Sequence, residues 1–241
     1  MAARHVMTLS LPRRVENEIL DSLPSNDPQS QRSRQDLRRI HRAMATLPIV
    51  QRALDRGASG FVPRTLLELG AGDGSLMLRL ARGRAASWPD VSVMLLDRLD
   101  LVSPQTLDEM RKVGWTPRVM VTDVFDWLAT CDGLRWDVVI ANLFMHHFSP
   151  DELEKLLVGI AARTEVFLCC EPRRSILALT GSHLIGLLGA GAVTRHDAVT
   201  SVHAGFRAQE LSSIWPDREN WAINEYSAGL FSHIFVALRK A

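Results

Sequence analysis

Two neighbouring histidines, His146 and His147, follow an apolar run and are the side chains best suited to acid–base chemistry. An imidazole has a pKa near neutrality, so it can remove the proton of a hydroxyl or phenol at physiological pH. Because the two residues are adjacent, we expect only one of them to face a reacting molecule. The sequence therefore predicts a catalytic role for His147 or His146.

A glycine-rich segment lies upstream, and its glycines are Gly70, Gly72 and Gly74. Glycines let a turn tighten and let backbone N–H groups approach a ligand closely. The spacing differs from the Gly-x-Gly-x-x-Gly fingerprint of dinucleotide-binding proteins, because Ser75 stands at the third glycine position. Glu68 and Asp73 bracket the segment, and a cationic ligand tolerates such carboxylates better than a pyrophosphate does.

Two further carboxylates end apolar runs. Asp97 can accept hydrogen bonds from both hydroxyls of a ribose, a feature shared with NAD enzymes. Asp123 can accept from the exocyclic amine of adenine, and the next residues, Val124 and Phe125, offer apolar contact to its ring. These positions predict a nucleoside-containing ligand.

The elements that position these residues alternate between strands and helices. Strands are expected over 65–69, 91–96, 119–122, 136–141 and 166–170, and helices over 75–84, over 106–113 and after the N-cap Ser149. Runs rich in Val, Ile and Leu without polar alternation are typical of parallel strands buried on both faces. The pattern predicts a doubly wound, Rossmann-like α/β fold with a seven-stranded, mostly parallel sheet, whose ligands bind at the carboxyl ends of the strands. The last two strands, Trp221–Ser227 and Phe231–Leu238, form an antiparallel hairpin.

The first sixty residues have a different pattern. Helices are expected over Pro12–Leu23 and over Gln31–Arg56, with Pro48 kinking or breaking the second. We therefore divide the chain into an N-terminal helical cap, residues 1–62, and a catalytic domain, residues 63–241. The second helix has a basic face without aromatic residues, which favours a solvated surface over a phosphate or RNA site.

An uncharged stretch, Ile176 to Thr194, is interrupted by four glycines. It is too broken for a membrane span, so we expect a buried helix or a lid on the acceptor side and no stable membrane insertion. The candidate acceptor-binding residues are Met145, Phe148, Leu177 and Leu184 for an apolar pocket, Arg173 for a polar end, and His41, His196 and His203 as further histidines.

The composition excludes several classes of protein. The apolar fraction is 46%, the charged fraction is 23% and the net charge is +1, which excludes collagen, disordered chains and disulfide scaffolds and gives no drive toward nucleic acid. The three cysteines are expected to be buried free thiols, and the N-terminus lacks a signal-peptide pattern, so we expect a cytoplasmic protein. Monomer and homodimer both remain open.

The run from Leu66 to Gly74 resembles the glycine-rich first motif of class I S-adenosylmethionine-dependent methyltransferases. Asp97, Asp123 and the strand from Asp137 to Asn142 fall at the family's later motifs in order and spacing. The run from Asn142 to Phe148 is similar to the small-molecule branch that includes ubiquinone and menaquinone methyltransferases. The resemblance covers about residue 63 to the C-terminus.

The resemblance implies S-adenosylmethionine as the cofactor and S-adenosylhomocysteine as its product. The three glycines would approach the methionine portion, Glu68 would orient the loop or meet the ammonium group through water, and Asn142 would lie near the sulfonium. Asp97 would hold the ribose and Asp123 the adenine. The remaining cofactor-site candidates are Ala71, Asp73, Arg98, Val124, Phe125 and Leu143.

The expected reaction is methyl transfer to a small hydrophobic or aromatic acceptor, such as a phenolic, quinone-like or polyketide molecule, on oxygen first and on carbon second. No dependable ligand cluster is visible in the sequence, so no metal is expected. The alternatives are an NAD-dependent oxidoreductase, a non-catalytic cofactor-binding accessory protein and, through the basic helix, an RNA methyltransferase.

Overall fold

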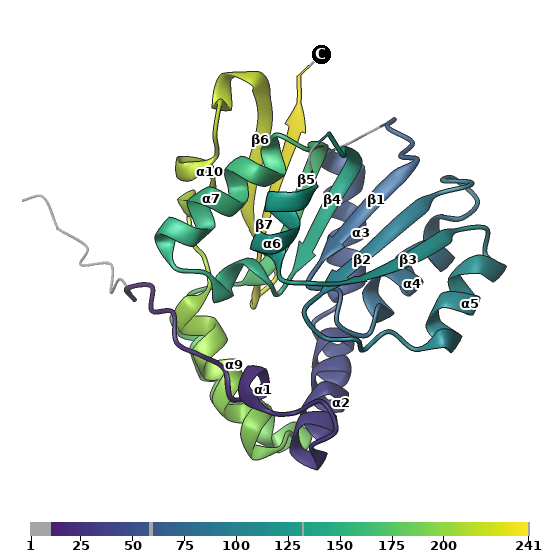
Figure 1. Ribbon diagram of the computed structural model, residues 1–241. Helices are drawn as coiled ribbons and strands as arrows, with labels where there is room; N and C mark the ends of the chain where they lie inside the picture. Colours follow the sequence, from purple (N-terminus) through teal and green to yellow (C-terminus); the bar gives the residue numbers. More distant parts are fainter. Residues whose placement is uncertain (1–10, 58–59, 132, 241) are drawn as a thin grey trace, which may run out of the picture.

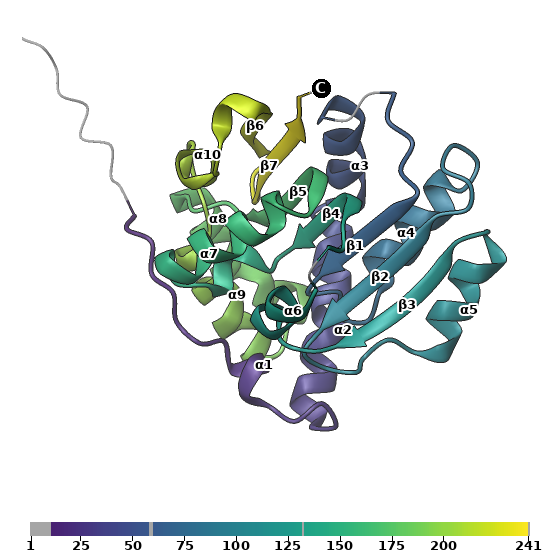
Figure 2. The same ribbon diagram turned by 45° about the horizontal axis from the view of Figure 1, so that its top comes forward.

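The computed structural model describes residues 11–57, 60–131 and 133–240 and is built around one seven-stranded sheet (Figures 1 and 2). The strand order is β3-β2-β1-β4-β5-β7-β6, and β7 runs antiparallel to β5 and β6 while the other pairs are parallel. This confirms the predicted sheet and its C-terminal hairpin. The strands are β1 (Thr65–Leu69), β2 (Ser92–Asp97), β3 (Thr116–Val121), β4 (Trp136–Asn142), β5 (Thr164–Pro172), β6 (Trp221–Ala228) and β7 (Ser232–Arg239).

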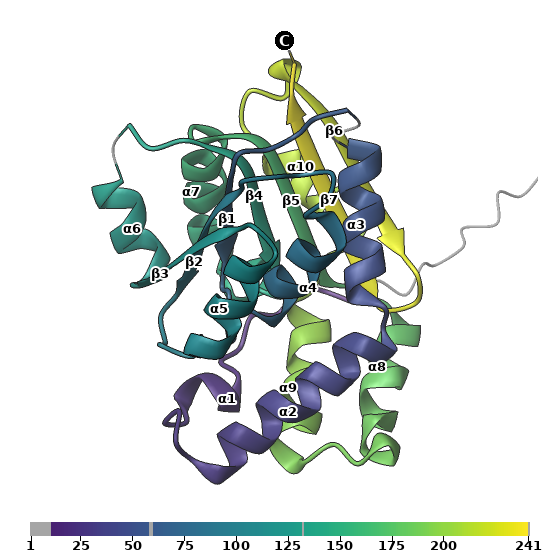
Figure 3. The same ribbon diagram turned by 90° about the vertical axis from the view of Figure 1, so that its right-hand side faces the viewer.

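Two apolar cores lie on the two faces of the sheet, because successive strand residues point to opposite sides. Leu66 joins one core and Leu67 the other. One face packs against α3 (Thr46–Gly57), α4 (Ser75–Arg84) and α5 (Pro104–Lys112), which Figure 3 shows together. The other packs against α6 (Val124–Thr130), α7 (Pro150–Ala161) and α10 (Glu210–Ile214), and a short 3₁₀ turn, η3 (Arg218–Asn220), precedes β6.

The predicted helix starts agree with the structure where the capping residues are local. The hydroxyl of Ser149 accepts from the backbone N–H of Glu152, and the Glu152 carboxylate accepts from the Ser149 N–H, so α7 begins with the expected capping box. Helix α6 was not expected, because Val124 and Phe125 are interpreted in the sequence as ligand contacts.

A helical cap covers the edge of the sheet at which the parallel strands end (Figures 1 and 3). It combines α1 (Ile19–Ser22) and α2 (Pro28–Ala43) with α8 (Ile176–Leu184), η2 (Ile185–Leu188) and α9 (Ala192–Ala204). The two parts are joined by Asp36 of α2, whose carboxylate accepts from the Gly191 N–H at 2.8 Å and from the Thr194 hydroxyl at 3.1 Å. The stretch from Ile176 to Thr194, expected as a buried helix or a lid, therefore packs with the N-terminal helices and forms part of this cap.

The predicted helix over Pro12–Leu23 is wrong for most of its length, since only Ile19–Ser22 is helical among residues 11–23. The backbone N–H of Arg14 donates to the His203 carbonyl, and the N–H groups of Ile19 and Leu20 donate to the Asp197 carboxylate. These long-range bonds replace the bonds a helix would make. We call residues 11–23 the N-terminal strap.

The second predicted helix is two helices, separated at Ala45, which has a positive φ of 55°. Pro48 lies in the first turn of α3, where its missing N–H is not required. Helix α3 packs on the sheet through Val50, Ala53 and Leu54. Helix α3 therefore packs on the sheet although its residues lie within the predicted N-terminal cap, residues 1–62.

Two further expectations, for the uncharged stretch and for the cysteines, can be compared with the structure. No helix in the described ranges is long and apolar enough to cross a membrane. Cys131, Cys169 and Cys170 are buried free thiols, as expected.

Candidate functional site

The glycine loop between β1 and α4 has a backbone that only glycine adopts easily. Gly70, Gly72 and Gly74 have φ values of 67°, 55° and 71°. A Cβ atom on Gly70 would lie 2.4 Å from Cδ2 of Phe144, so the loop also needs a residue without a side chain there. The Ala71 N–H donates to the Leu96 carbonyl at 3.0 Å, which ties the loop to the end of β2.

Three of the acidic candidates around this loop, Asp97, Asp123 and Asp73, hold backbone groups. The Asp97 carboxylate accepts from the N–H groups of Gly72 at 2.8 Å and Leu99 at 2.9 Å. Asp123 is the N-cap of α6 and accepts from the Phe125 N–H at 2.8 Å. Each carboxylate oxygen can accept more than one hydrogen bond, so these contacts leave capacity for a ligand.

Asp73 has a similar double role. Its carboxylate accepts from the Ser75 N–H at 3.1 Å at the start of α4 and lies 3.1 Å from the guanidinium of Arg38 in α2. The loop is thereby joined to the cap.

Two buried polar atoms at the ends of neighbouring strands have no hydrogen-bond partner within the described chain: Oε2 of Glu68 in β1 and Oδ1 of Asn142 in β4. The Glu68 side chain is only 2% exposed, and burial, followed by the charges of Asp73 and Asp97, raises its pKa well above the ordinary value. Unpartnered buried oxygens are rare in native folds and indicate a missing ligand or water.

Aromatic side chains close the loop that follows β4. The Phe148 ring meets those of Phe144 and Phe125 edge to face, with centroid distances of 5.0 and 5.6 Å. Val124, the first residue of α6, is buried in the core. Leu143 has a positive φ of 52°, and its N–H donates to the Cys170 carbonyl at 2.9 Å. Such backbone strain in a non-glycine residue is concentrated at functional sites.

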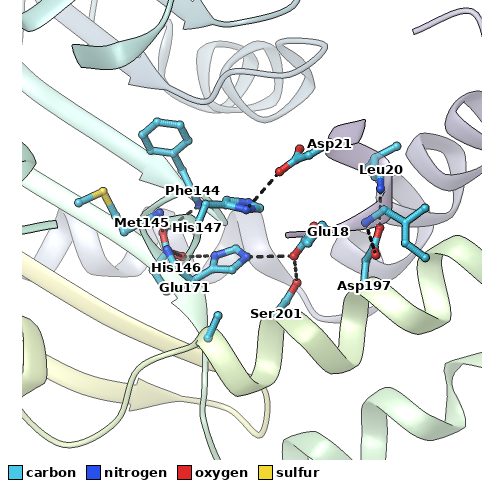
Figure 4. A network of polar contacts seen from close by, with 12 residues as sticks. Glu18, Leu20, Asp21, Phe144, Met145, His146, His147, Glu171, Asp197 and Ser201 are labelled. Atoms are coloured by element: carbon cyan, nitrogen blue, oxygen red, sulfur yellow. Dashed lines mark hydrogen bonds and ion pairs between the residues drawn. The ribbon is translucent and has the colours of Figure 1, made fainter. Parts of the chain in front are cut away.

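The histidine pair lies in a 3₁₀ turn, η1 (Met145–His147), organised by the fully buried carboxylate of Glu171 in β5 (Figure 4). This carboxylate accepts from the backbone N–H groups of Phe144 at 3.1 Å, Met145 at 3.0 Å and His146 at 3.3 Å. It also lies 2.7 Å from Nδ1 of His146. Glu171 therefore fixes the turn and the orientation of the His146 ring together.

The strap supplies the other side of this site. A carboxylate oxygen of Glu18 lies 3.4 Å from Nε2 of His146 and accepts from the Ser201 hydroxyl, and the Asp21 carboxylate lies 3.5 Å from Nδ1 of His147 (Figure 4). Arg13 holds the strap in place, because its guanidinium donates to the carbonyls of His146 at 3.2 Å and Phe148 at 2.9 Å.

The two histidines differ electrostatically. Burial opposes a charge on His146, but its hydrogen bonds to Glu171 and Glu18 outweigh that and raise its pKa to about 9. Burial lowers the pKa of His147, and the nearby charge on His146 lowers it further. The His147 side chain is 27% exposed, whereas that of His146 is 3% exposed. His147 is therefore the more accessible ring.

The structure separates the predicted acceptor-binding residues. Met145 is fully buried and Phe148 half-buried beside the histidine pair, whereas Leu177 and Leu184 are each 53% exposed on α8. Arg173 donates to the Gly229 carbonyl in the hairpin turn.

The other candidates lie in three further places. His196 and His203 line a separate cavity of about 550 Å³ between α8, α9 and the strap. His41 lies in α2, where burial lowers its pKa to about 4. Arg98 lies 3.9 Å from Asp21.

Sequence reasoning missed Glu18, Asp21 and Ser201, and it did not include Glu171 among the site residues. Glu171 carried a usable signal, because it follows a buried apolar strand as Asp97 does. Glu18 and Asp21 carried none, since their role depends on the extended strap.

No family model matches the chain, and no curated protein sequence matches it. Solved structures do resemble it. The plantazolicin methyltransferase BpumL, in complex with a pentazolic desmethylPZN analog and SAH, has a TM-score of 0.62 at 11% identity over 89% of this chain and 92% of that chain. Magnesium protoporphyrin IX methyltransferase (ChlM) from Synechocystis PCC 6803, with bound SAH, has a TM-score of 0.54 at 18% identity over 92% of this chain and 91% of that chain.

An O-methyltransferase family protein from Burkholderia thailandensis has a TM-score of 0.53 at 18% identity, over 90% of this chain and 64% of that chain. Together with the sheet order, these likenesses show that the chain has the class I methyltransferase fold.

Proposed function

We propose that this chain is an S-adenosylmethionine-dependent methyltransferase whose acceptor is a small hydrophobic or aromatic molecule. The observation that carries the proposal is the left-handed glycine loop after β1, bound through Gly72 to Asp97 at the end of β2. This loop lies where the strand order reverses between β1 and β4, the place at which doubly wound sheets bind their ligands. The resembling structures that contain SAH support this cofactor.

The residues at this edge fit the cofactor. Oε2 of Glu68 and Oδ1 of Asn142 are buried and have no hydrogen-bond partner among the described residues. A Cβ atom on Gly72 would meet nothing within 4 Å, so the loop has open space there. We assign the methionine portion to the three glycines and Glu68, the ribose to Asp97 and the adenine to Asp123 and Phe125. Ala71, Asp73, Arg98 and Leu143 complete the proposed surroundings.

The bound cofactor would supply a methyl group on a sulfonium, which is already an activated electrophile. The protein's main task is then to hold the acceptor close and aligned. The rings of Phe144 and Phe148, which meet edge to face, are apolar and aromatic, which favours an aromatic acceptor. A hydroxyl or phenol must also lose its proton, and the histidine pair is the group suited to assist that loss. We therefore place oxygen before carbon as the methylated atom.

Calorimetry with SAH and S-adenosylmethionine tests the cofactor assignment. Asp97→Ala should weaken SAH binding about 10- to 100-fold, because a charged acceptor contributes about 1.5–3 kcal/mol. Asp108→Ala, which removes an exposed carboxylate paired with Arg111 on α5, is the matched control and should leave binding unchanged. Absence of SAH binding to the folded wild-type chain would refute the proposal.

Labelled-methyl transfer from S-adenosylmethionine to small-molecule extracts tests turnover. Transfer to an extractable aromatic compound is the expected result. SAH binding without transfer to any component would favour a non-catalytic cofactor-binding protein.

A further inference from the structure

Three side chains with metal-ligating atoms meet beneath the strap. One donor atom each from Glu18, His146 and His147 lies within 4.8 Å of the other two. The His146 Nε2 to Glu18 Oε1 distance is 3.4 Å, which is close to the separation of two ligands around one ion at bond lengths of about 2.1 Å. This pair therefore has the spacing of two ligands around one ion, and the His147 donor atom lies within 4.8 Å of both.

The adjacency of the two histidines does not prevent chelation. In an extended strand, neighbouring side chains point to opposite faces. Here the 3₁₀ turn η1 brings both rings to one side, with centroids 4.2 Å apart and planes tilted by 33°. On this backbone the two adjacent histidines can therefore contribute to one site.

The surroundings resemble those of metal-bound histidines. Such a histidine usually donates its second ring N–H to a carboxylate, which fixes the ring and leaves the other nitrogen free for the ion. His146 has this arrangement, since Nδ1 lies 2.7 Å from the buried Glu171 and Nε2 faces Glu18. The Ser201 hydroxyl donates to the same Glu18 oxygen and orients that carboxylate.

The charges around the rings favour a cation between them. The carboxylates of Glu18, Asp21 and Glu171 surround the two imidazoles, and the side chains of Glu18 and Glu171 are only 11% and 0% exposed. Two fixed positive charges lie nearby: the Arg13 guanidinium is directed to the carbonyls of His146 and Phe148, and Arg98 lies 3.9 Å from Asp21. Buried carboxylates require compensation by a cation or a proton.

We propose that Glu18, His146 and His147 bind a divalent transition-metal ion of the zinc type, with Glu171 as the partner that orients His146. Two imidazoles and one carboxylate suit this class of ion and leave a coordination position open, where an oxygen ligand is bound and polarised. We assign that ligand as the oxygen of the acceptor molecule, and this assignment rests on the proposed function. The site replaces the sequence expectation that no metal is bound.

Metal titration of the full chain, prepared without a histidine tag and stripped with a chelator, tests the site. Calorimetry with Zn²⁺ and visible absorption with Co²⁺ should both show one ion per chain. Glu18→Gln and His147→Asn should each weaken binding at least tenfold, and Glu171→Gln about 10- to 100-fold. His183→Asn changes an exposed histidine on α8 outside the cluster and should have no effect.

Failure of the site has a separate signature from failure of the cofactor assignment. No Co²⁺ spectrum, or equal binding by the wild type, Glu18→Gln and His147→Asn, would overturn the metal site and leave a protonated His146 between two carboxylates. SAH calorimetry on the same metal-free samples reports on the cofactor site independently. Thermal unfolding checks that each variant is folded, and if Glu18→Gln does not fold, His147→Asn decides the outcome.

Discussion

The glycine loop and the histidine turn lie at the same edge of the sheet, but contacts of different range hold them. Gly72 and Asp97 are 25 residues apart and belong to consecutive strand ends. His146 and Glu18 are 128 residues apart, and Glu171, Arg13 and Ser201 join from other elements. The hydrogen bond that holds the glycine loop therefore joins consecutive elements of the chain. The histidine site, in contrast, depends on contacts with the distant strap.

The strongest test of the loop is Gly70→Ala. The new Cβ would meet Phe144 at 2.4 Å, and alanine would also have to adopt a φ of 67°. Overpacking of this kind costs about 1–3 kcal/mol, and displacement of the loop should weaken SAH binding by more than 100-fold. Calorimetry and urea unfolding measure the two effects.

Gly229→Ala is its control, because Gly229 has the same φ of 67° but nothing within 4 Å of a new Cβ. It should lose some stability from the backbone strain and keep normal SAH binding. Equal loss of binding in both variants would mean that general destabilisation of the fold, and not contact with Phe144, lowers the SAH affinity.

The corresponding test of the histidine turn is Glu171→Gln. An amide has one acceptor oxygen for the backbone N–H groups of Phe144, Met145 and His146, and its NH₂ group can only donate. We expect a loss of about 1–3 kcal/mol in the free energy of unfolding, measured with urea, and less than a threefold change in SAH affinity. Glu165→Gln at an exposed ion pair should be nearly neutral. A large loss of SAH affinity would show that the two regions are one cooperative unit.

The same contrast explains what the sequence could predict. The strand positions, the capping box at Ser149 and the loop glycines follow from residues close together in the chain, and they were predictable. The strap was predicted as a helix because Val15, Ile19, Leu20 and Leu23 have helical spacing. Bonds to Asp197 and His203 override that local preference, and no local pattern announces partners more than 170 residues away. The histidine pair was therefore identified, but its carboxylate partners were not.

Asp197→Ala should loosen the strap, with a smaller loss in the free energy of unfolding than Glu171→Gln. Its carboxylate accepts from the N–H groups of Ile19 at 2.8 Å and Leu20 at 3.0 Å, so the change removes the acceptor for the first N–H groups of α1. Loss of a cap of this kind costs about 0.5–2 kcal/mol. Hydrogen exchange should accelerate in residues 11–23 and stay unchanged in β1 and α4. Faster exchange in α4 as well would contradict the separation of the two regions.

Glu68→Gln is the mildest change and uses pH. Burial raises the pKa of Glu68 well above its ordinary value, so between the pKa of the unfolded chain and that of the folded chain the folded chain keeps a proton that the unfolded chain has lost. The free energy of unfolding therefore carries no penalty from Glu68 below pH 4.5, and it falls as the pH rises above that value. Glutamine is neutral at every pH. The variant should therefore melt at nearly the wild-type temperature at pH 4.5 and a few degrees higher at pH 8.

SAH affinity distinguishes a functional acid from a merely buried one. If Glu68 meets the ammonium group of the cofactor through water, Glu68→Gln should bind SAH about tenfold more weakly while the cofactor-free protein becomes more stable at pH 8. Such opposite changes are typical of residues that favour function over stability. A variant that melts at the wild-type temperature at both pH values would mean that the pKa of Glu68 is not raised in the folded chain. Unchanged SAH affinity would remove Glu68 from the cofactor site and leave the glycines and Asp97 to define it.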